Sequence, residues 1–171
     1  MSTSILVARA IGIGGAFWLS GNIAALSFIS VPALNLAKGD GAANAGSLTR
    51  LWRYNYELGK AQNPPIAALT AASLSFLAWS SRAAPMPLYL YGAAAALTVG
   101  IVPYTIATMR ITNNKLIKKS EEIGRQGLSA QVSVDEEMEV QELLKRWTWL
   151  NGIRSILPAL GGIAAFLAAT I

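Results

Sequence analysis

Three side chains near the C-terminus have the chemistry to bind an oxygen-rich aromatic molecule. Trp147, Asn151 and Arg154 follow i, i+4, i+7 spacing, which places them on one face of a helix. An indole stacks on flat rings, an amide donates or accepts hydrogen bonds, and a guanidinium binds oxyanions. Arg154 has an alternative role, because a long cationic side chain in an apolar helix can extend to lipid headgroups.

A second stripe of the same kind lies around residue 56. Trp52, Tyr56 and Lys60 follow i, i+4, i+8 spacing. An aromatic belt at a membrane interface would also explain the two rings. Glu57 adds a carboxylate beside this stripe, and an ion pair with Lys60 or Arg53 on an exposed helix would also account for it.

Other polar residues lie at the end of an apolar stretch or deep within one. Tyr104, Thr112 and Asn113 follow one such stretch, and the last two also fit as caps of a following helix. Asn22 lies in the middle of another, where polar groups are costly unless paired. An amide hydrogen bond between helices is the alternative to a ligand contact at Asn22.

These polar and aromatic groups gather at one end of the expected helices, whereas the other ends carry almost none. We therefore expect a cleft lined by rings, amides and cations. Such a lining suits a flat phenolic or enolic ligand better than a sugar or a metal ion.

The composition limits the chemistry and indicates a membrane protein. Of 171 residues, 53% are hydrophobic and 13% are charged, whereas a soluble domain carries about 25% charged residues. The chain has no cysteine and no histidine, which excludes thiolate nucleophiles, imidazole bases and metal sites that need either ligand. Any catalysis must use carboxylates, lysine, tyrosine, amides or the substrate itself.

Four stretches are long and apolar enough to cross a bilayer, which takes about 20 residues. They cover residues 5–36, 61–81, 83–109 and 147–171, joined by connections 37–60 and 110–146. We predict a single all-α domain, an integral membrane four-helix bundle. Ser133 and Glu136 form a capping-box pattern, so the last helix is expected to start there and continue into the fourth span.

The basic residues predict the orientation of this bundle. All lysines and arginines except Arg9 and Arg82 fall on the side of the two connections. By the positive-inside rule that side is cytosolic, so the cleft faces the cytosol and both termini lie on the non-cytosolic side. We expect an integral protein of the endoplasmic reticulum or a related endomembrane, in contact with membrane lipid. Nucleic acid is not an expected partner, because the basic residues are interspersed with carboxylates.

Small residues and prolines shape the expected packing. Gly12 with Ala16 and Gly161 with Ala165 offer close-packing faces that would serve either the bundle or a homo-oligomer. A break or kink at 64–65, where two prolines follow each other, is expected between an interfacial helix and the second span.

Several short motifs are spread along nearly the whole chain. The most specific are GIVPYT at 100–105 and TNNKL at 112–116. The others are SVPAL at 30–34, WTWLNGIR at 147–154, and Trp52, Tyr56 and Gly59. Together they resemble the anthrone-oxygenase-like family of small four-span membrane proteins. The resemblance implies a monooxygenase of secondary-metabolite biosynthesis that oxidises an aromatic polyketide with molecular oxygen. Characterised relatives convert an anthrone to an anthraquinone with no evident cofactor, so no cofactor is expected.

Such a reaction needs a base for an acidic methylene, donors for the resulting oxyanion and shelter from water. The candidates for proton removal are Glu57, Tyr104 and, if burial favours its neutral form, Lys60. The donors expected to bind the oxyanion or neighbouring phenols are Arg154, Asn113 and Asn151. The side chains expected to complete the substrate site are Trp52, Tyr56, Trp147, Asn22 and Thr112.

Two other functions stay open. A cyclase or isomerase of a similar pathway would use acid–base groups in the same cleft and would turn over without oxygen. A non-catalytic tetraspan scaffold would not depend on the polar cleft residues at all. A transporter is disfavoured because the spans contain no aspartate or glutamate and no visible inverted repeat.

Overall fold

The computed structural model describes residues 2–126 and 132–171, which are almost entirely helical. The helices are α1 (Thr3–Ala25), α2 (Val31–Gly39), α3 (Ala45–Ser80), α4 (Pro85–Tyr104), α5 (Arg110–Gln126) and α6 (Val134–Thr170). Two π-helical turns, η1 (Leu26–Ser30) and η2 (Thr105–Met109), interrupt them. The all-helical prediction is confirmed for the described residues, which contain no strand.

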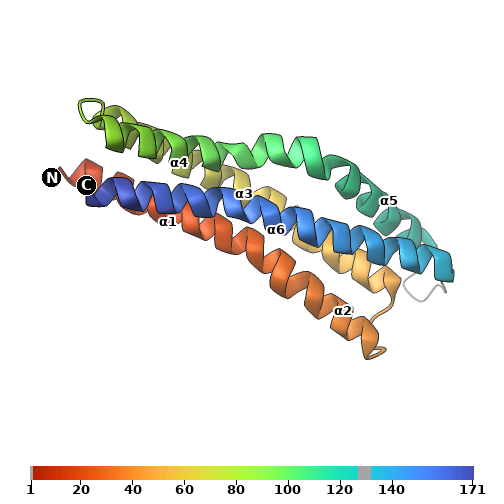
Figure 1. Cartoon of the computed structure of the whole chain (residues 1–171). Helices are drawn as coiled ribbons and strands as arrows, with labels where there is room; N and C mark the ends of the chain where they lie inside the picture. Colours follow the sequence, from red (N-terminus) through yellow and green to blue (C-terminus); the bar gives the residue numbers. More distant parts are fainter. Residues whose placement is uncertain (1, 127–131) are drawn as a thin grey trace.

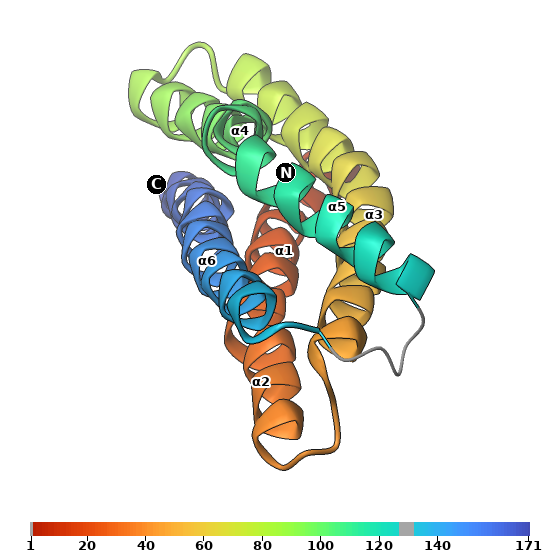
Figure 2. The same ribbon diagram turned by 90° about the vertical axis from the view of Figure 1, so that its right-hand side faces the viewer.

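Four long helices surround a common axis (Figures 1 and 2). α6 packs against α1 and α4, and α3 packs against the same two helices from the opposite side. Both termini lie at the same end as the turn between α3 and α4, which we call the terminal end. α2 and α5 lie at the other end, which we call the connection end (Figure 1).

Three helical runs are long and apolar enough to cross a membrane. They are Thr3–Gly39, Pro85–Arg125 and Val134–Thr170. α3, expected to carry the second span, is not among them. The apolar half of α3 contains two prolines, three serines and one threonine, which lower its mean hydropathy.

A proline lies beside each π-helical turn. Pro32 follows η1 and Pro103 precedes η2 by two residues. A proline lacks an N–H and its ring clashes with the carbonyl four residues earlier, so the helix relaxes into a wider turn nearby. Around η2, the hydroxyls of Thr105 and Thr108 donate to the carbonyl oxygens of Ile101 and Tyr104, at 2.6 and 2.7 Å.

The expected break between an interfacial helix and the second span is wrong. α3 is one helix of 36 residues that includes both Pro64 and Pro65. The two prolines are exposed on the surface of the bundle. As a result, Tyr56, Lys60 and the apolar half of α3 lie on one continuous rod.

The start of α6 agrees with the sequence pattern. Ser133 is the N-cap of α6, and its hydroxyl accepts a hydrogen bond from the backbone N–H of Glu136 at 3.3 Å. α6 then runs without interruption to Thr170, so the predicted entry into the fourth apolar stretch is confirmed.

The interior is packed in three layers along the bundle axis. The connection layer includes Leu48, Trp52, Met109, Leu116, Leu144 and Trp147. The terminal layer includes Leu74, Leu77, Tyr91, Ala94 and Ala165. A smaller middle layer consists of Leu19, Ala67 and Ile101. The space between the connection layer and the middle layer forms a cavity.

Candidate active site

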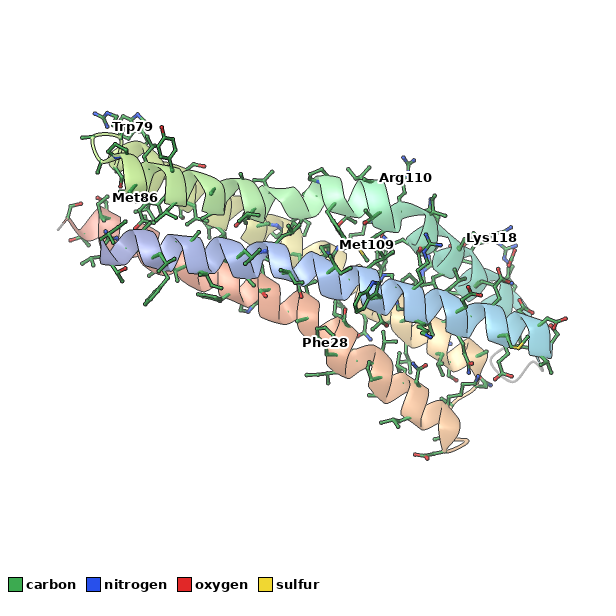
Figure 3. The ribbon with its side chains drawn as sticks, in the orientation of Figure 1. Phe28, Trp79, Met86, Met109, Arg110 and Lys118 are labelled. Carbon is green, nitrogen blue, oxygen red and sulfur yellow. The ribbon has the colours of Figure 1, made fainter. Side chains whose placement is uncertain are left out.

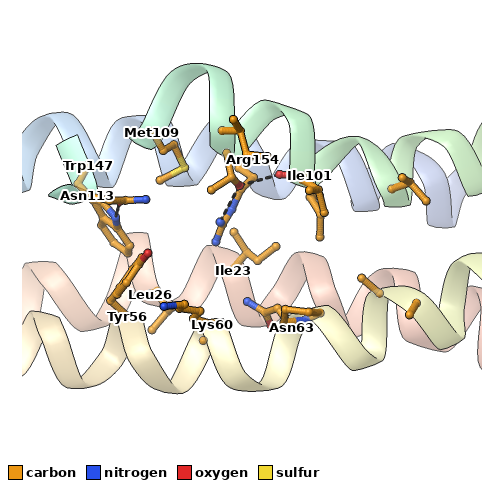
Figure 4. Close-up of a pocket in the computed structure, with 18 residues that line it drawn as sticks. Ile23, Leu26, Tyr56, Lys60, Asn63, Ile101, Met109, Asn113, Trp147 and Arg154 are labelled. Carbon is orange, nitrogen blue, oxygen red and sulfur yellow. Dashed lines mark hydrogen bonds between the residues drawn. The ribbon is translucent and has the colours of Figure 1, made fainter. Parts of the chain in front are cut away.

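A cavity of about 600 Å³ lies inside the bundle (Figure 4). Met109 and Trp147 of the connection layer close one end, and Ala67 and Ile101 of the middle layer close the other. Its volume is within the range of sites for small organic molecules. The side chains that bring polar atoms into its lining are Tyr56, Lys60, Asn63, Thr105, Asn113 and Arg154.

Arg154 extends from α6 into this cavity instead of toward lipid headgroups (Figure 4). One terminal N–H donates to the hydroxyl of Thr105 at 3.0 Å. Its Nε is buried and has no hydrogen-bond partner. No carboxylate of the described residues forms an ion pair with Arg154. A guanidinium that is partly removed from water without a counterion is costly, so the cavity favours a ligand with negative charge near Arg154.

Asn113 lines the cavity next to Trp147. The indole Nε1–H of Trp147 donates to Oδ1 of Asn113 at 3.0 Å, and both side chains are buried. Because the amide oxygen is engaged, the NH₂ group of Asn113 is the part available to a ligand. The bond also joins α5 to α6 at this level of the bundle.

Asn63 is a polar lining residue from α3. The amide of Asn22 on α1 donates to Oδ1 of Asn63 at 2.7 Å. This bond turns the NH₂ group of Asn63 into a donor for the cavity, as the Trp147 bond does for Asn113. Asn22 itself does not line the cavity, and its contact is the interhelical amide bond considered as an alternative above.

Three aromatic rings pack together at the connection side of the cavity, and two of them, Tyr56 and Trp147, line it. Trp52 stacks on Tyr56 with ring centroids 5.3 Å apart and 17° between planes, and meets the edge of Trp147 at 5.7 Å. Trp52 is fully buried behind the other two rings and does not reach the cavity. The hydroxyl of Tyr56 points into the cavity, close enough to interact electrostatically with Arg154 (Figure 4).

Lys60 lies at the edge of the cavity and Glu57 lies outside it. Lys60 Nζ is 3.9 Å from the Glu57 carboxylate, and the two side chains are 64% and 48% exposed. The burial that would favour a neutral Lys60 is therefore lacking. Glu57 pairs with Lys60 on an exposed helix face, which agrees with the alternative interpretation of Glu57.

Other predicted residues hold the helices instead of lining the cavity. Asn151 is buried, and its amide donates to the carbonyl oxygen of Ile23 at 2.9 Å and to the hydroxyl of Ser27 at 2.8 Å. Tyr104 donates from its hydroxyl to the carbonyl oxygen of Leu150 at 3.1 Å. Thr112 is buried without facing the cavity.

Known proteins that resemble this chain agree on one family. The family described as anthrone oxygenase matches residues 52–164. The chain belongs to the anthrone oxygenase family. Similar proteins include the anthrone oxygenase encC of Aspergillus fumigatus, 40% identical over 94% of this chain and 91% of the relative. No solved structure matches the chain.

Two further relatives extend the agreement. The anthrone oxygenase AgnL2 of Paecilomyces divaricatus is 32% identical over 100% of this chain and 99% of its own length. A noranthrone monooxygenase of Aspergillus flavus is 27% identical over 88% of this chain and 67% of its own length. Membership of the anthrone oxygenase family confirms the resemblance found in the motifs and the expectation of a monooxygenase.

In this member of the anthrone oxygenase family, the cavity brings together part of the residues predicted from the sequence. Those that line it are Tyr56, Lys60, Asn113, Trp147 and Arg154. Those that do not are Asn22, Trp52, Glu57, Tyr104, Thr112 and Asn151. Asn63 was missed, although it follows Lys60 by three residues on the same helical stripe, because the two prolines after it suggested the end of a helix.

Proposed function

We propose that this chain is a membrane-embedded, cofactor-independent oxygenase that oxidises an anthrone-like phenolic polyketide with molecular oxygen in secondary-metabolite biosynthesis. The names of its relatives support the reaction class. The observation that carries the proposal is the partly buried Arg154, whose Nε is buried without a hydrogen-bond partner. It has no anionic partner among the described residues and faces a cavity with two amide donors.

The proposed membrane topology has four spans, with α3 as the fourth beside the three apolar helical runs. Both termini lie at one end of the bundle, as an even number of spans requires. The excess of basic residues at the connection end supports a cytosolic location for that end. The endoplasmic reticulum or a related endomembrane is the proposed compartment.

The proposed substrate enters the reaction as an enolate. An anthrone carries a methylene between two aromatic rings, and loss of a proton places negative charge on the oxygen across the central ring. Arg154, Asn63 and Asn113 supply N–H donors for this oxyanion and for neighbouring phenols. Tyr56 and Trp147 provide flat surfaces for the rings.

The oxidation then balances without another reactant. The enolate passes one electron to oxygen, and the resulting radical and superoxide combine through a new C–O bond. After protonation the product is a hydroperoxide on the former methylene carbon. Loss of the remaining C–H proton with cleavage of the O–O bond gives a ketone and water. The methylene is oxidised by four electrons and oxygen is reduced by four.

The proposed proton acceptor is the phenolic oxygen of Tyr56. The cavity lining contains no carboxylate among the described residues, and the other candidate there, Lys60, is exposed and paired with Glu57. Arg154 interacts electrostatically with Tyr56, and Lys60 Nζ lies 6.0 Å from the Tyr56 ring centroid. Tyr56 is therefore the lining residue that we assign to proton removal.

Isotope labelling of the purified protein tests this function. When the reaction is run in ¹⁸O₂, we expect one O₂ molecule to be consumed per substrate. One labelled oxygen atom should appear in the quinone and the other in water. The sample should be free of haem and flavin by absorbance, and activity should survive treatment with a metal chelator. Turnover that continues unchanged without oxygen would instead indicate a cyclase or isomerase. If cells with cavity variants made normal product levels, and cells lacking the whole protein did not, the protein would be a scaffold.

A further inference from the structure

The cavity is closed along the bundle axis in both directions. The connection layer, with fully buried Trp52, Leu116 and Leu144, separates it from the connection end. The middle and terminal layers separate it from the terminal end. As far as the described residues show, the remaining route to the cavity is through the side of the bundle.

The exposed residues of the cavity lining mark where that side opening lies. On α3 they are Lys60, Pro64 and Ala68, and on α4 and η2 they are Val99, Val102 and Ile106. Ile23 of α1 and Trp147 of α6 also line the cavity, and both are buried. The opening therefore lies between α3 and the α4–η2 segment, and we call it the side opening.

The side opening is apolar except at one end. Its rim lies within the charge-free stretches 61–81 and 83–109, apart from Lys60. From Lys60 to Ala68 the rim extends about 12 Å along α3, at 1.5 Å per residue. Val99, Val102 and Ile106 on the opposite rim are each more than half exposed. Such a rim matches hydrocarbon along most of its length and a headgroup region near Lys60.

We propose that the substrate of this enzyme enters the cavity from the lipid bilayer through the side opening. This inference rests on the proposed oxygenase function and specifies its substrate as a lipophilic phenol dissolved in the membrane. The polar edge of the phenol passes Lys60 toward Asn113 while its apolar rings pass between Ala68 and Val102. Oxygen, which is apolar, reaches the cavity by the same route.

Narrowing the opening tests the route. Ala68→Trp and Val102→Trp place a large ring on each rim. In proteoliposomes, kcat/KM for an anthrone should fall about tenfold or more, whereas single turnover of substrate already bound should keep its rate. Ala72→Trp is the matched control, because Ala72 is exposed on the same face of α3 one turn beyond the cavity and should leave kcat/KM unchanged. Unchanged kcat/KM in both rim variants, with an active wild-type enzyme, would overturn the route and leave the oxygenase function standing.

A second measurement does not depend on catalysis. The chain has no cysteine, so Ala68→Cys and Val102→Cys each create a single thiol. In sealed liposomes both thiols should react with a bilayer-soluble maleimide and resist a charged one, and an added anthraquinone should slow the reaction. Lys118→Cys, outside the apolar stretches, should react with the charged reagent. Rapid reaction of the rim thiols with the charged maleimide would contradict entry from the bilayer, even if no anthrone were turned over.

Discussion

At the residue scale, Arg154 is the lining cation that has no anionic partner among the described residues. A guanidinium removed from water loses hydration that a single hydrogen bond to Thr105 replaces only in part. Bound enolate would replace the rest, because its charge develops where the N–H groups already point. The unsatisfied N–H groups of Arg154, which are costly in the empty site, are therefore available to lower the barrier of enolate formation.

Arg154→Gln should lower kcat by about 10²–10³-fold, the usual effect of removing one oxyanion donor. Arg154→Lys keeps the charge without the planar fork of donors, so we expect an intermediate loss. Oxygen uptake with an anthrone measures both variants. Arg146→Gln, on an exposed face of the same helix, is the control. Full activity of Arg154→Gln would show that the enolate is stabilised elsewhere.

The proton acceptor makes a second residue-scale prediction. Tyr56→Phe keeps the stacked ring and removes the phenolic oxygen, so kcat should fall about 10²-fold or more while substrate binding changes little. Glu57→Gln should leave kcat unchanged, since the carboxylate lies outside the cavity. Tyr54→Phe, an exposed tyrosine of α3, controls for a general effect on the helix. A large loss with Glu57→Gln and none with Tyr56→Phe would reverse the assignment.

Residue types at helical spacing predicted part of this site. Whether each of these residues lines the cavity also depends on how deep it lies in the bundle, which the spacing does not give. Tyr56 and Trp52 share one stripe, but only the structure shows that Trp52 lies behind Tyr56. Asn151 carries the same amide as Asn113, yet its donors are used by Ile23 and Ser27. The sequence contains no signal for which amide is engaged by a neighbouring backbone.

At the element scale, the π-helical turns bring the cavity lining into place. Leu26 of η1 and Thr105, Ile106 and Met109 of η2 all line the cavity. A π turn adds a residue without ending the helix, so it rotates the side chains that follow. Pro32 and Pro103 lie beside these two turns, but the prolines of α3 had no comparable effect on its course. Neighbouring contacts, which the sequence alone does not reveal, decide between these outcomes.

Asn151 fastens η1 to α6, and its removal should destabilise the bundle. Asn151→Ala leaves the carbonyl oxygen of Ile23 and the hydroxyl of Ser27 without their donor. The expected cost is about 1–3 kcal/mol, the penalty for buried groups that lose a hydrogen bond. Thermal unfolding in detergent measures it. Asn114→Ala, an exposed neighbour of Asn113, should be neutral, and equal melting of both variants would contradict this role.

Gly59 sets the width of the cavity on α3. A methyl group there would lie 3.4 Å from Leu26 Cδ1 and 3.7 Å from Asn63 Nδ2, which is close contact without a clash. Gly59→Ala should therefore keep the fold, with the helix gain of about 0.5–1 kcal/mol usual for this change, while reducing space for the substrate. Relative to the wild type, we expect Gly59→Ala to raise KM more for a three-ring substrate than for a smaller phenol. Gly92→Ala is the control, because a methyl group at residue 92 would meet nothing within 4 Å, and it should change neither KM. If the wild type, Gly59→Ala and Gly92→Ala had equal KM values for the three-ring substrate, the substrate would bind elsewhere.

At the scale of the whole molecule, charge is concentrated at the connection end. Lys38 pairs with Glu137 at 2.6 Å and Lys119 pairs with Glu139 at 2.7 Å, which joins α2 and α5 to the start of α6. Arg110 and Lys118 point away from the bundle (Figure 3). Of the basic residues, only Arg9 and Arg82 lie at the terminal end. The two ends therefore differ in the number of positive charges, the property that sets the orientation of membrane insertion.

The number of spans then decides where the two termini lie. With α3 inserted there are four spans and both termini share one side, whereas three spans would place them on opposite sides. Because the chain has no cysteine, Ser2→Cys, Ser81→Cys and Asp40→Cys report single positions. In sealed microsomes, an impermeant maleimide should label Asp40→Cys from the cytosolic side and reach Ser2→Cys, Ser81→Cys and a cysteine at Thr170 only after detergent is added. Labelling of Ser2→Cys and Thr170→Cys from opposite sides would remove α3 from the membrane, and with it the hydrocarbon surroundings of the side opening.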